Sequence, residues 1–174
     1  FNTFKGNLKF SEVVLDAKAK GFTEPDPRDD LSGLDVARKA LILSRDCGAK
    51  MELSDIAVEN LVPESLREVD VKTFLSKLPD VDASYEKLKK DAESKGNVLR
   101  YMAVIENGKV SIELKQVDSQ HPFYNLSGSD NMIVFTTERY KTNPLVIKGP
   151  GAGAEVTAAG VFAEIITISN YMAS

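Results

Sequence analysis

The hydrophobic period of this chain changes after Gly96, and this change restricts the fold more than any other feature. Before that point, apolar residues recur with the spacing of amphipathic helices. After it come four strand-like segments: "VLRYMAVIE", "KVSIELKQV", "NMIVFTTE" and "NPLVIKG". Because helices come first and strands later, the order favours an α+β fold over a wound βαβ array.

Boundary residues support several of the predicted helices. The first, over residues 10–20, has Ser11 as its expected N-cap and Gly21 as its stop. Asn107-Gly108, between the first two strand-like segments, is a strong signal for a two-residue hairpin turn. Four further segments are predicted to be helical: "PESL", "VKTFLSKL", "DASYEKLKKDAESKG" and the apolar "EVTAAGVFAEIITISNYM".

A second helix is predicted from about Gly33 to Asp46. Ser32 is its expected N-cap, and an acidic residue at the third helical position resembles a capping box. We expect this helix to be mostly buried, with Cys47 on its packed face. The apolar face is predicted to comprise Val36, Ala40, Leu43 and Cys47, widened by Ala37, Leu41 and Ser44.

Composition excludes several classes of protein. The chain has 174 residues and a mass of 19.0 kDa, which fits one domain. Its net charge is −4 and it has no basic stripe, so nucleic acid is not an expected partner. No apolar run is long enough for a membrane span. A single cysteine excludes an internal disulfide and fits a reducing compartment. Because the sequence starts at Phe1, we expect a fragment of a longer protein.

An acidic loop, "EPDPRDDLSGLDVARK" over residues 24–39, carries five carboxylates. Three interpretations are open: a metal site, a site for a cationic group, or a solvated turn before a helix. The loop lacks the glycine rhythm of a calcium-binding EF-hand, whereas magnesium stays possible. An ammonium group on a substrate suits such carboxylates well. Asp and Pro also favour turns and helix starts, so the structural interpretation is strong.

Asp35 and Lys39 lie four residues apart on the second predicted helix, so they share a face. One interpretation is a surface ion pair that contributes at most about 1 kcal/mol. The other is a lysine held by a carboxylate for proton transfer, with its pKa lowered by partial desolvation. The spacing alone does not choose between them.

A glycine-rich segment, "GPGAGAEVTAAG", joins the last predicted strand to the terminal helix. Backbone N–H groups at such a junction suit anions, and small residues allow a ligand to approach closely. A Rossmann core would need a further strand and a later acidic residue, and neither follows here. The segment is therefore expected to be either one wall of a nucleotide site or a tight turn. His121, the single histidine, is expected to be structural.

Several segments together resemble the catalytic portion of homoserine dehydrogenases. They occur in the expected order: "FSEVV", "GFTEPDPRDDLSGLDVARKALILSRDCG", "MELSDI", "VLRYMAVIE", "HPFYNLSGSDN" and "PLVIKGPGAGAEVTAAGVFAEI". The resemblance covers essentially the whole chain and is greatest to the form fused behind an aspartokinase. It implies one catalytic and dimerisation domain over residues 1–174, with a mixed sheet flanked by helices and without the family's Rossmann domain.

The resemblance also implies an activity and its residues. Members of this family interconvert L-homoserine and L-aspartate 4-semialdehyde with NADP or NAD, in threonine, methionine and isoleucine biosynthesis. Lys39 and Asp35 are the implied catalytic residues, with Lys39 moving the proton at the substrate oxygen. Phe22 replaces a tyrosine that many relatives carry. The implied substrate-binding residues are Gly21, Glu24, Asp30 and Asp35, and the implied cofactor contacts are Gly151, Ala152, Gly153 and Thr157.

The resemblance implies no metal site and predicts a homodimer or higher homo-oligomer. The expected location is the cytoplasm for a bacterial source and the plastid for a plant source. A competing hypothesis is a non-catalytic dimerisation or amino-acid-binding module. The set of Glu24, Asp35 and Lys39 distinguishes the two, because a dimerisation module needs no lysine supported by a carboxylate.

Overall fold

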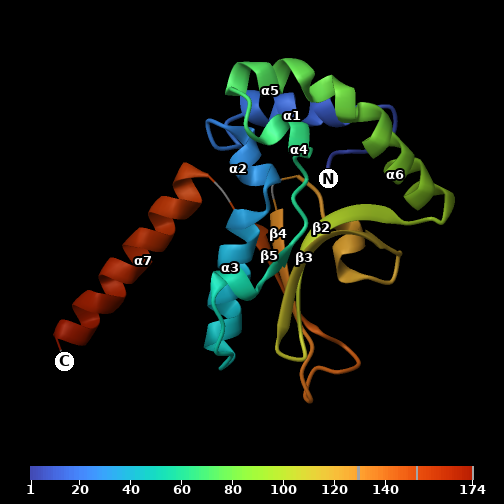
Figure 1. Ribbon diagram of the computed structural model, residues 1–174. Coiled ribbons are helices and arrows are strands. Elements are labelled where there is room, and N and C mark those ends of the chain that lie inside the picture. The colour runs from blue at the N-terminus through green and yellow to red at the C-terminus, as the bar shows by residue number, and fades with distance from the viewer. Residues whose placement is uncertain (129, 152, 174) are drawn as a thin grey trace. The chain divides into compact units, whose positions relative to one another are not determined.

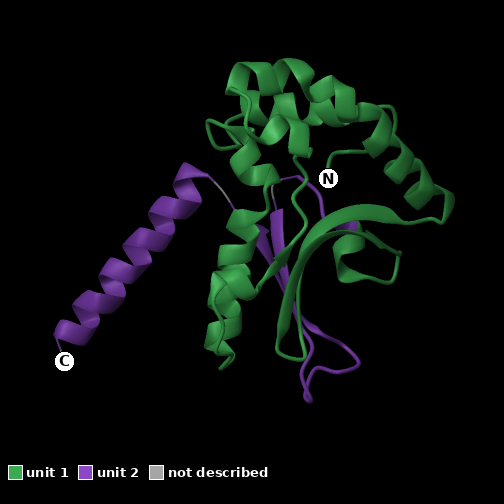
Figure 2. Ribbon diagram, viewed as in Figure 1, with its two compact units in different colours: residues 1–124 green, residues 125–174 purple. Residues whose placement is uncertain are grey.

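The computed structural model describes residues 1–128, 130–151 and 153–173. The chain divides into two compact units, Phe1–Tyr124 and Asn125–Ser174 (Figure 2). The first unit contains the acidic loop, and the second contains the glycine-rich segment. None of the helices in the described ranges has the length and apolar character required to cross a bilayer.

The first unit combines helices with a small mixed sheet (Figure 1). In the sheet, β3 lies between the other two strands, parallel to β1 and antiparallel to β2. The helices are α1 (Phe10–Ala19), α2 (Pro27–Leu31), α3 (Leu34–Asp46), α4 (Glu64–Arg67), α5 (Val71–Lys77) and α6 (Asp82–Ser94), with 3-10 segments η1 (Leu53–Asp55), η2 (Leu78–Val81) and η3 (Pro122–Asn125). The strands are β1 (Ala57–Val58), β2 (Val98–Glu106) and β3 (Lys109–Val117).

The β2–β3 hairpin turns at Asn107-Gly108, as the sequence predicts. Both residues have positive φ, 52° and 72°, which a type I′ turn requires. The nine-residue strands pair along their whole length, from Val98 opposite Val117 to Glu106 opposite Lys109. This long hairpin supports α3, which runs along it in Figure 1.

Two clusters of buried side chains form the core of this unit. Small residues of α3, Ala37 and Ala40, pack on the sheet against Ile56, Val110 and Ile112. The small side chains allow α3 to approach the strands closely, which fixes its position. A larger cluster joins the helices around the fully buried Phe74, and it comprises Phe4, Phe10, Val14, Val62, Leu66, Phe74, Leu78, Val81, Tyr85, Ala92 and Leu99.

Gly33 sets the start of α3. It is buried, has a left-handed φ of 77° and serves as the N-cap residue. The Tyr101 hydroxyl donates to the Glu59 carbonyl at 2.6 Å and lies directly against Gly33. A Cβ added at Gly33 would stand 1.9 Å from that hydroxyl oxygen and 2.9 Å from Cγ1 of Val58. Only glycine suits both the backbone angle and the space.

Replacing Gly33 with alanine is therefore expected to lower the free energy of unfolding by about 2–4 kcal/mol. Gly96 provides the matched control, because its φ is 70° and nothing lies within 4 Å of an added Cβ. Gly96→Ala should cost only the backbone term of about 1 kcal/mol. Urea unfolding followed by circular dichroism measures both, and equal costs would contradict the role given to the Tyr101 contact.

The second unit consists of a hairpin followed by one long helix. Strands β4 (Asp130–Phe135) and β5 (Leu145–Pro150) pair antiparallel, and α7 (Ala154–Met172) follows the glycine-rich segment. Within this unit Lys148 forms an ion pair with Asp130 at 3.1 Å.

The predicted α+β class, the four long strand segments and the six predicted helices are confirmed. Four details are wrong. Helix α3 is not mostly buried: only Ala37, Ala40 and Ser44 are, because a narrow face of the helix packs on the sheet. Ser11 is not an N-cap, because α1 begins one residue earlier; its backbone N–H and hydroxyl both donate to Asp82 instead. Ser32 ends α2, and Gly33 caps α3. Cys47 is exposed rather than packed, because the helix ends at Asp46 before that position turns inward.

Candidate active site

The acidic loop folds into a short helix that the sequence patterns did not reveal. Asp26 caps α2 by accepting from the backbone N–H of Arg28 at 3.0 Å, and Pro27 occupies the first helical position. The Arg28 guanidinium binds the same carboxylate through Nε and Nη2, the latter at 2.6 Å. These hydrogen bonds hold the pKa of Asp26 below its ordinary value. Asp26 is therefore occupied by its own loop, as the helix-start interpretation expects.

Glu24 and Asp30 form the second part of the loop. The backbone N–H of Glu24 donates to Oδ2 of Asp30 at 2.9 Å. The pKa of Asp30 is raised, because its carboxyl is partly desolvated and lies close to negative charge on Glu24 and Asp35. Among the residues that the structure describes, none pairs with the Glu24 carboxylate by a hydrogen bond or an ion pair. This carboxylate is available for a cationic group.

Asp35 and Lys39 form the ion pair that their spacing predicts. Nζ of Lys39 lies 2.9 Å from Oδ2 of Asp35, in the first turns of α3. Their side chains are 57% and 60% exposed. Lys39 is thus held by its carboxylate but is not desolvated by the first unit. If Lys39 acts as an acid or base, a bound substrate or another surface that covers this face of α3 has to supply the desolvation.

Electrostatic coupling joins these residues into one cluster. The negative charges of Glu24 and Asp35 both help to raise the pKa of Asp30, and Asp35 forms an ion pair with Lys39. The loop and the start of α3 therefore offer an unpaired carboxylate on Glu24 and a solvent-exposed ammonium on Lys39 that is paired with Asp35. Within the described ranges, no group of three or more His, Cys, Asp or Glu side chains has the arrangement of a metal site.

Gly21 and Phe22 precede the loop. Gly21 has a left-handed φ of 72° after the end of α1, and an added Cβ would meet nothing within 4 Å. Its backbone angle, rather than close contact, favours glycine there. Phe22 is 54% exposed, like several other large apolar side chains of this unit.

The glycine-rich residues lie in the second unit. Gly151 approaches Asn131 of β4 so closely that an added Cβ would lie 1.9 Å from its Nδ2. Gly153 has a φ of 130° and caps α7. The Thr157 hydroxyl donates to the Gly153 carbonyl at 3.0 Å, so it is already engaged within the helix. Ala152 lies outside the described residues. Packing on Asn131 thus explains Gly151 without a ligand.

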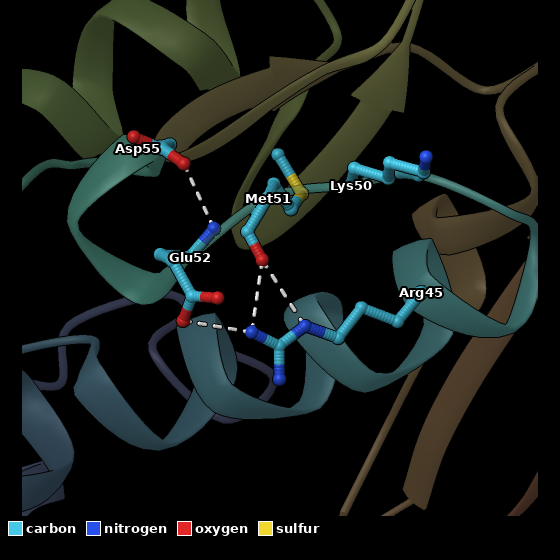
Figure 3. A pocket seen from close by; sticks show the side chains of 6 residues that line it. Arg45, Lys50, Met51, Glu52 and Asp55 are labelled. Atoms are coloured by element: carbon cyan, nitrogen blue, oxygen red, sulfur yellow. Dashed lines mark hydrogen bonds and ion pairs between the residues drawn. The ribbon is translucent and has the colours of Figure 1, made fainter.

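A hollow lies at the far end of α3 from Asp35. Figure 3 shows the side chains of Arg45 and Lys50 at its wall pointing in different directions. Arg45 is already bonded to the Met51 carbonyl and to Glu52, at 2.9 and 2.8 Å. The hollow contains none of the predicted site residues, and it presents no converging set of free polar groups.

Comparison with known proteins identifies the family to which this chain belongs. The family model described as homoserine dehydrogenase matches residues 1–166. This chain belongs to the homoserine dehydrogenase family. Members of this oxidoreductase family act in amino-acid biosynthesis and generally use NAD(P). The resemblance inferred from the sequence motifs is therefore confirmed.

Two curated relatives of this chain illustrate the match. A chloroplastic bifunctional aspartokinase/homoserine dehydrogenase of Arabidopsis thaliana is 52% identical over 175 aligned residues, covering 99% of this chain and 19% of that protein. The homoserine dehydrogenase of Saccharomyces cerevisiae is 47% identical over 174 residues, covering 97% of this chain and 48% of that protein. The chain thus spans about a fifth of the plant relative and about half of the yeast one.

Solved structures agree on the fold. A Candida auris protein of unknown function superposes with a TM-score of 0.88 and 47% identity, covering 96% of this chain and 48% of that one. The homoserine dehydrogenase of S. aureus superposes with a TM-score of 0.68 at 24% identity, covering 96% of this chain and 38% of that one. The predicted homoserine dehydrogenase catalytic-domain-like fold is confirmed.

Arg28 and Lys18 are the structural residues of the site that sequence reasoning missed. Arg28 was given no role, although the two-residue spacing in "DPR" allows its side chain to reach Asp26. Nζ of Lys18 in α1 donates to the Pro25 carbonyl, next to Glu24. The sequence held no signal for that contact, because a lysine on an exposed helix face normally points into water.

Proposed function

We propose that this chain supplies the substrate-binding and catalytic part of an NAD(P)-dependent homoserine dehydrogenase. The observation that supports the proposal is the cluster around Asp30, in which Glu24 keeps a free carboxylate while Asp35 holds Lys39. The substrates are L-homoserine and L-aspartate 4-semialdehyde, as family membership implies.

The cluster suits the chemistry of homoserine, which carries an ammonium, a carboxylate and a primary alcohol. In our proposal Glu24 binds the ammonium, because it is a free carboxylate on a fixed backbone. Lys39 takes the alcohol proton during oxidation as the neutral amine and returns it during reduction as the ammonium, and Asp35 orients Lys39. Asp30 fixes the backbone of Glu24 and adds negative charge beside it. Gly21, where the chain leaves α1 with a left-handed φ of 72°, is also proposed to bind the substrate, together with Asp30 and Asp35.

NADP or NAD supplies the hydride chemistry when bound, and the protein supplies position and electrostatics. We propose that the cofactor is held mainly by a part of the enzyme outside residues 1–174. Gly151, Gly153 and Thr157, with Ala152 between them, are proposed to form one wall of that site. The exposed backbone at the start of α7 fits this role. Because the hydroxyl and the backbone N–H of Thr157 both donate to the Gly153 carbonyl, Thr157 contributes its methyl group.

We further propose that residues 1–174 form one functional domain and that the enzyme is a homodimer or higher homo-oligomer. A plastid location is proposed for a plant source, since the plant relatives are named as chloroplastic, and a cytoplasmic location for a bacterial source. A fused aspartate kinase is proposed on the same relatives.

Steady-state assays of the full-length protein that contains this chain test the proposed function. With L-homoserine and either NADP or NAD, we expect reduced nicotinamide and a trappable aldehyde to appear together. With residues 1–174 alone we expect neither, because the cofactor site is incomplete. A full-length protein that binds both molecules but makes no product would favour the alternative, a non-catalytic dimerisation or amino-acid-binding module.

A further inference from the structure

Arg28 makes more contacts than a residue on a surface loop normally does. Besides Asp26, its Nη1 donates to the carbonyls of Leu66 and Arg67, at 3.3 and 3.0 Å, and to that of Val69. These carbonyls belong to the end of α4 and the connection to α5, so they have few partners within their own helix. The side chain is only 16% exposed.

An aromatic ring completes the setting of Arg28. Its guanidinium carbon lies 5.5 Å from the ring centroid of Phe74, the fully buried centre of the helical core. The planar guanidinium thus joins one carboxylate, three carbonyls and one ring at a single point. A lysine has three donors on one atom and cannot reproduce this fork.

This anchor fixes the segment that presents Glu24. Asp26 and Arg28 connect the start of α2 to α4 and α5, the Pro25 carbonyl accepts from Lys18, and the Glu24 N–H donates to Asp30 of the same short helix. A five-residue helix is not stable by itself, so its position depends on such tertiary contacts. Glu24 therefore has a fixed backbone and a free carboxylate.

We infer that Arg28 is a positioning residue for substrate recognition, acting through Glu24. This inference rests on the proposed function. Arg28 does not touch the substrate in this account, because its donors are already used inside the protein. Its loss should misplace the Glu24 carboxylate and weaken ammonium binding, while the Asp35–Lys39 pair on α3 keeps its geometry.

The test is a double-mutant cycle in the full-length enzyme. We expect Arg28→Lys to raise KM for homoserine by about 10-fold and to change kcat by less than about 3-fold. In a Glu24→Gln background, the same substitution should change KM by less than about 2-fold, because the residue it positions has lost its charge. Arg67→Lys is the matched control, because the Arg67 guanidinium also bonds a local carbonyl, that of Val62, and Arg67 bonds Arg28 only through its backbone carbonyl, which lysine keeps.

Two results would overturn the inference: an unchanged KM in Arg28→Lys, or an equal increase of KM with and without the Glu24 carboxylate. If Arg28→Lys does not fold, Asp26→Asn replaces it, because asparagine keeps the helix cap and removes the charge that holds Arg28. It should raise KM in the same way and show the same coupling to Glu24. Failure of the proposed function itself is distinguishable, because then Glu24→Gln alone would leave KM for homoserine unchanged.

Discussion

Replacing Lys39 with alanine in the full-length enzyme is expected to lower kcat by about 10²–10⁴-fold, the usual contribution of a positioned acid or base. KM for homoserine should change little, because in our proposal Glu24, not Lys39, binds the ammonium. The reason is structural: Lys39 is held 2.9 Å from Asp35 on a helix whose start is fixed by Gly33. Steady-state kinetics in both directions measure the effect.

Arg38 is the control for this substitution. It is the neighbouring exposed cation on α3 and does not pair with Asp35 in the structure. Arg38→Ala should therefore keep kcat within about 3-fold of the unmodified enzyme. Near-normal turnover of Lys39→Ala would remove Lys39 from the proton-transfer role. A rise of KM alone would make it a binding residue instead.

Replacing Glu24 with glutamine is expected to raise KM for homoserine by about 10–100-fold, the cost of losing one charged hydrogen-bonding partner. The shape and the backbone bond to Asp30 remain, so the fold should not change. Asp29→Asn is the matched control, because Asp29 is an exposed carboxylate of the same loop that accepts no backbone bond from Glu24. Its KM should stay within about 3-fold of normal. Equal effects of the two variants would mean that only net charge matters.

Elements with a long, regular period were predictable from the sequence. The hairpin β2–β3 shows strand patterns on both sides of Asn107-Gly108, and α6 and α7 show helical patterns over 13 and 19 residues. Helix α2 was missed because five residues are too few to show a period, and because its residues also suit a turn. Cys47 was misplaced because a helical wheel does not show where the helix ends.

Part of the site was predictable, and part was not. The pair of Asp35 and Lys39 follows from the spacing of a helix. Which loop carboxylate is engaged and which is unpaired does not follow from the sequence. Asp26 is engaged because the Arg28 guanidinium, held by distant carbonyls, binds it, whereas the Glu24 carboxylate has no partner among the described residues. Those contacts join Arg28 to carbonyls 38 to 41 residues later in the chain, and no local pattern reports them. The three-dimensional fold decides which carboxylate remains for a ligand.

The most direct test of the central claim compares homoserine with 4-hydroxybutyrate, which is homoserine without its ammonium group. The measured quantity is the ratio of kcat/KM for the two substrates, in the unmodified full-length enzyme and in Glu24→Gln. If Glu24 binds the ammonium, the unmodified enzyme should prefer homoserine by about 100-fold or more, and Glu24→Gln should lose most of that preference. An unchanged preference in Glu24→Gln would contradict the account, because the ammonium would then be recognised elsewhere.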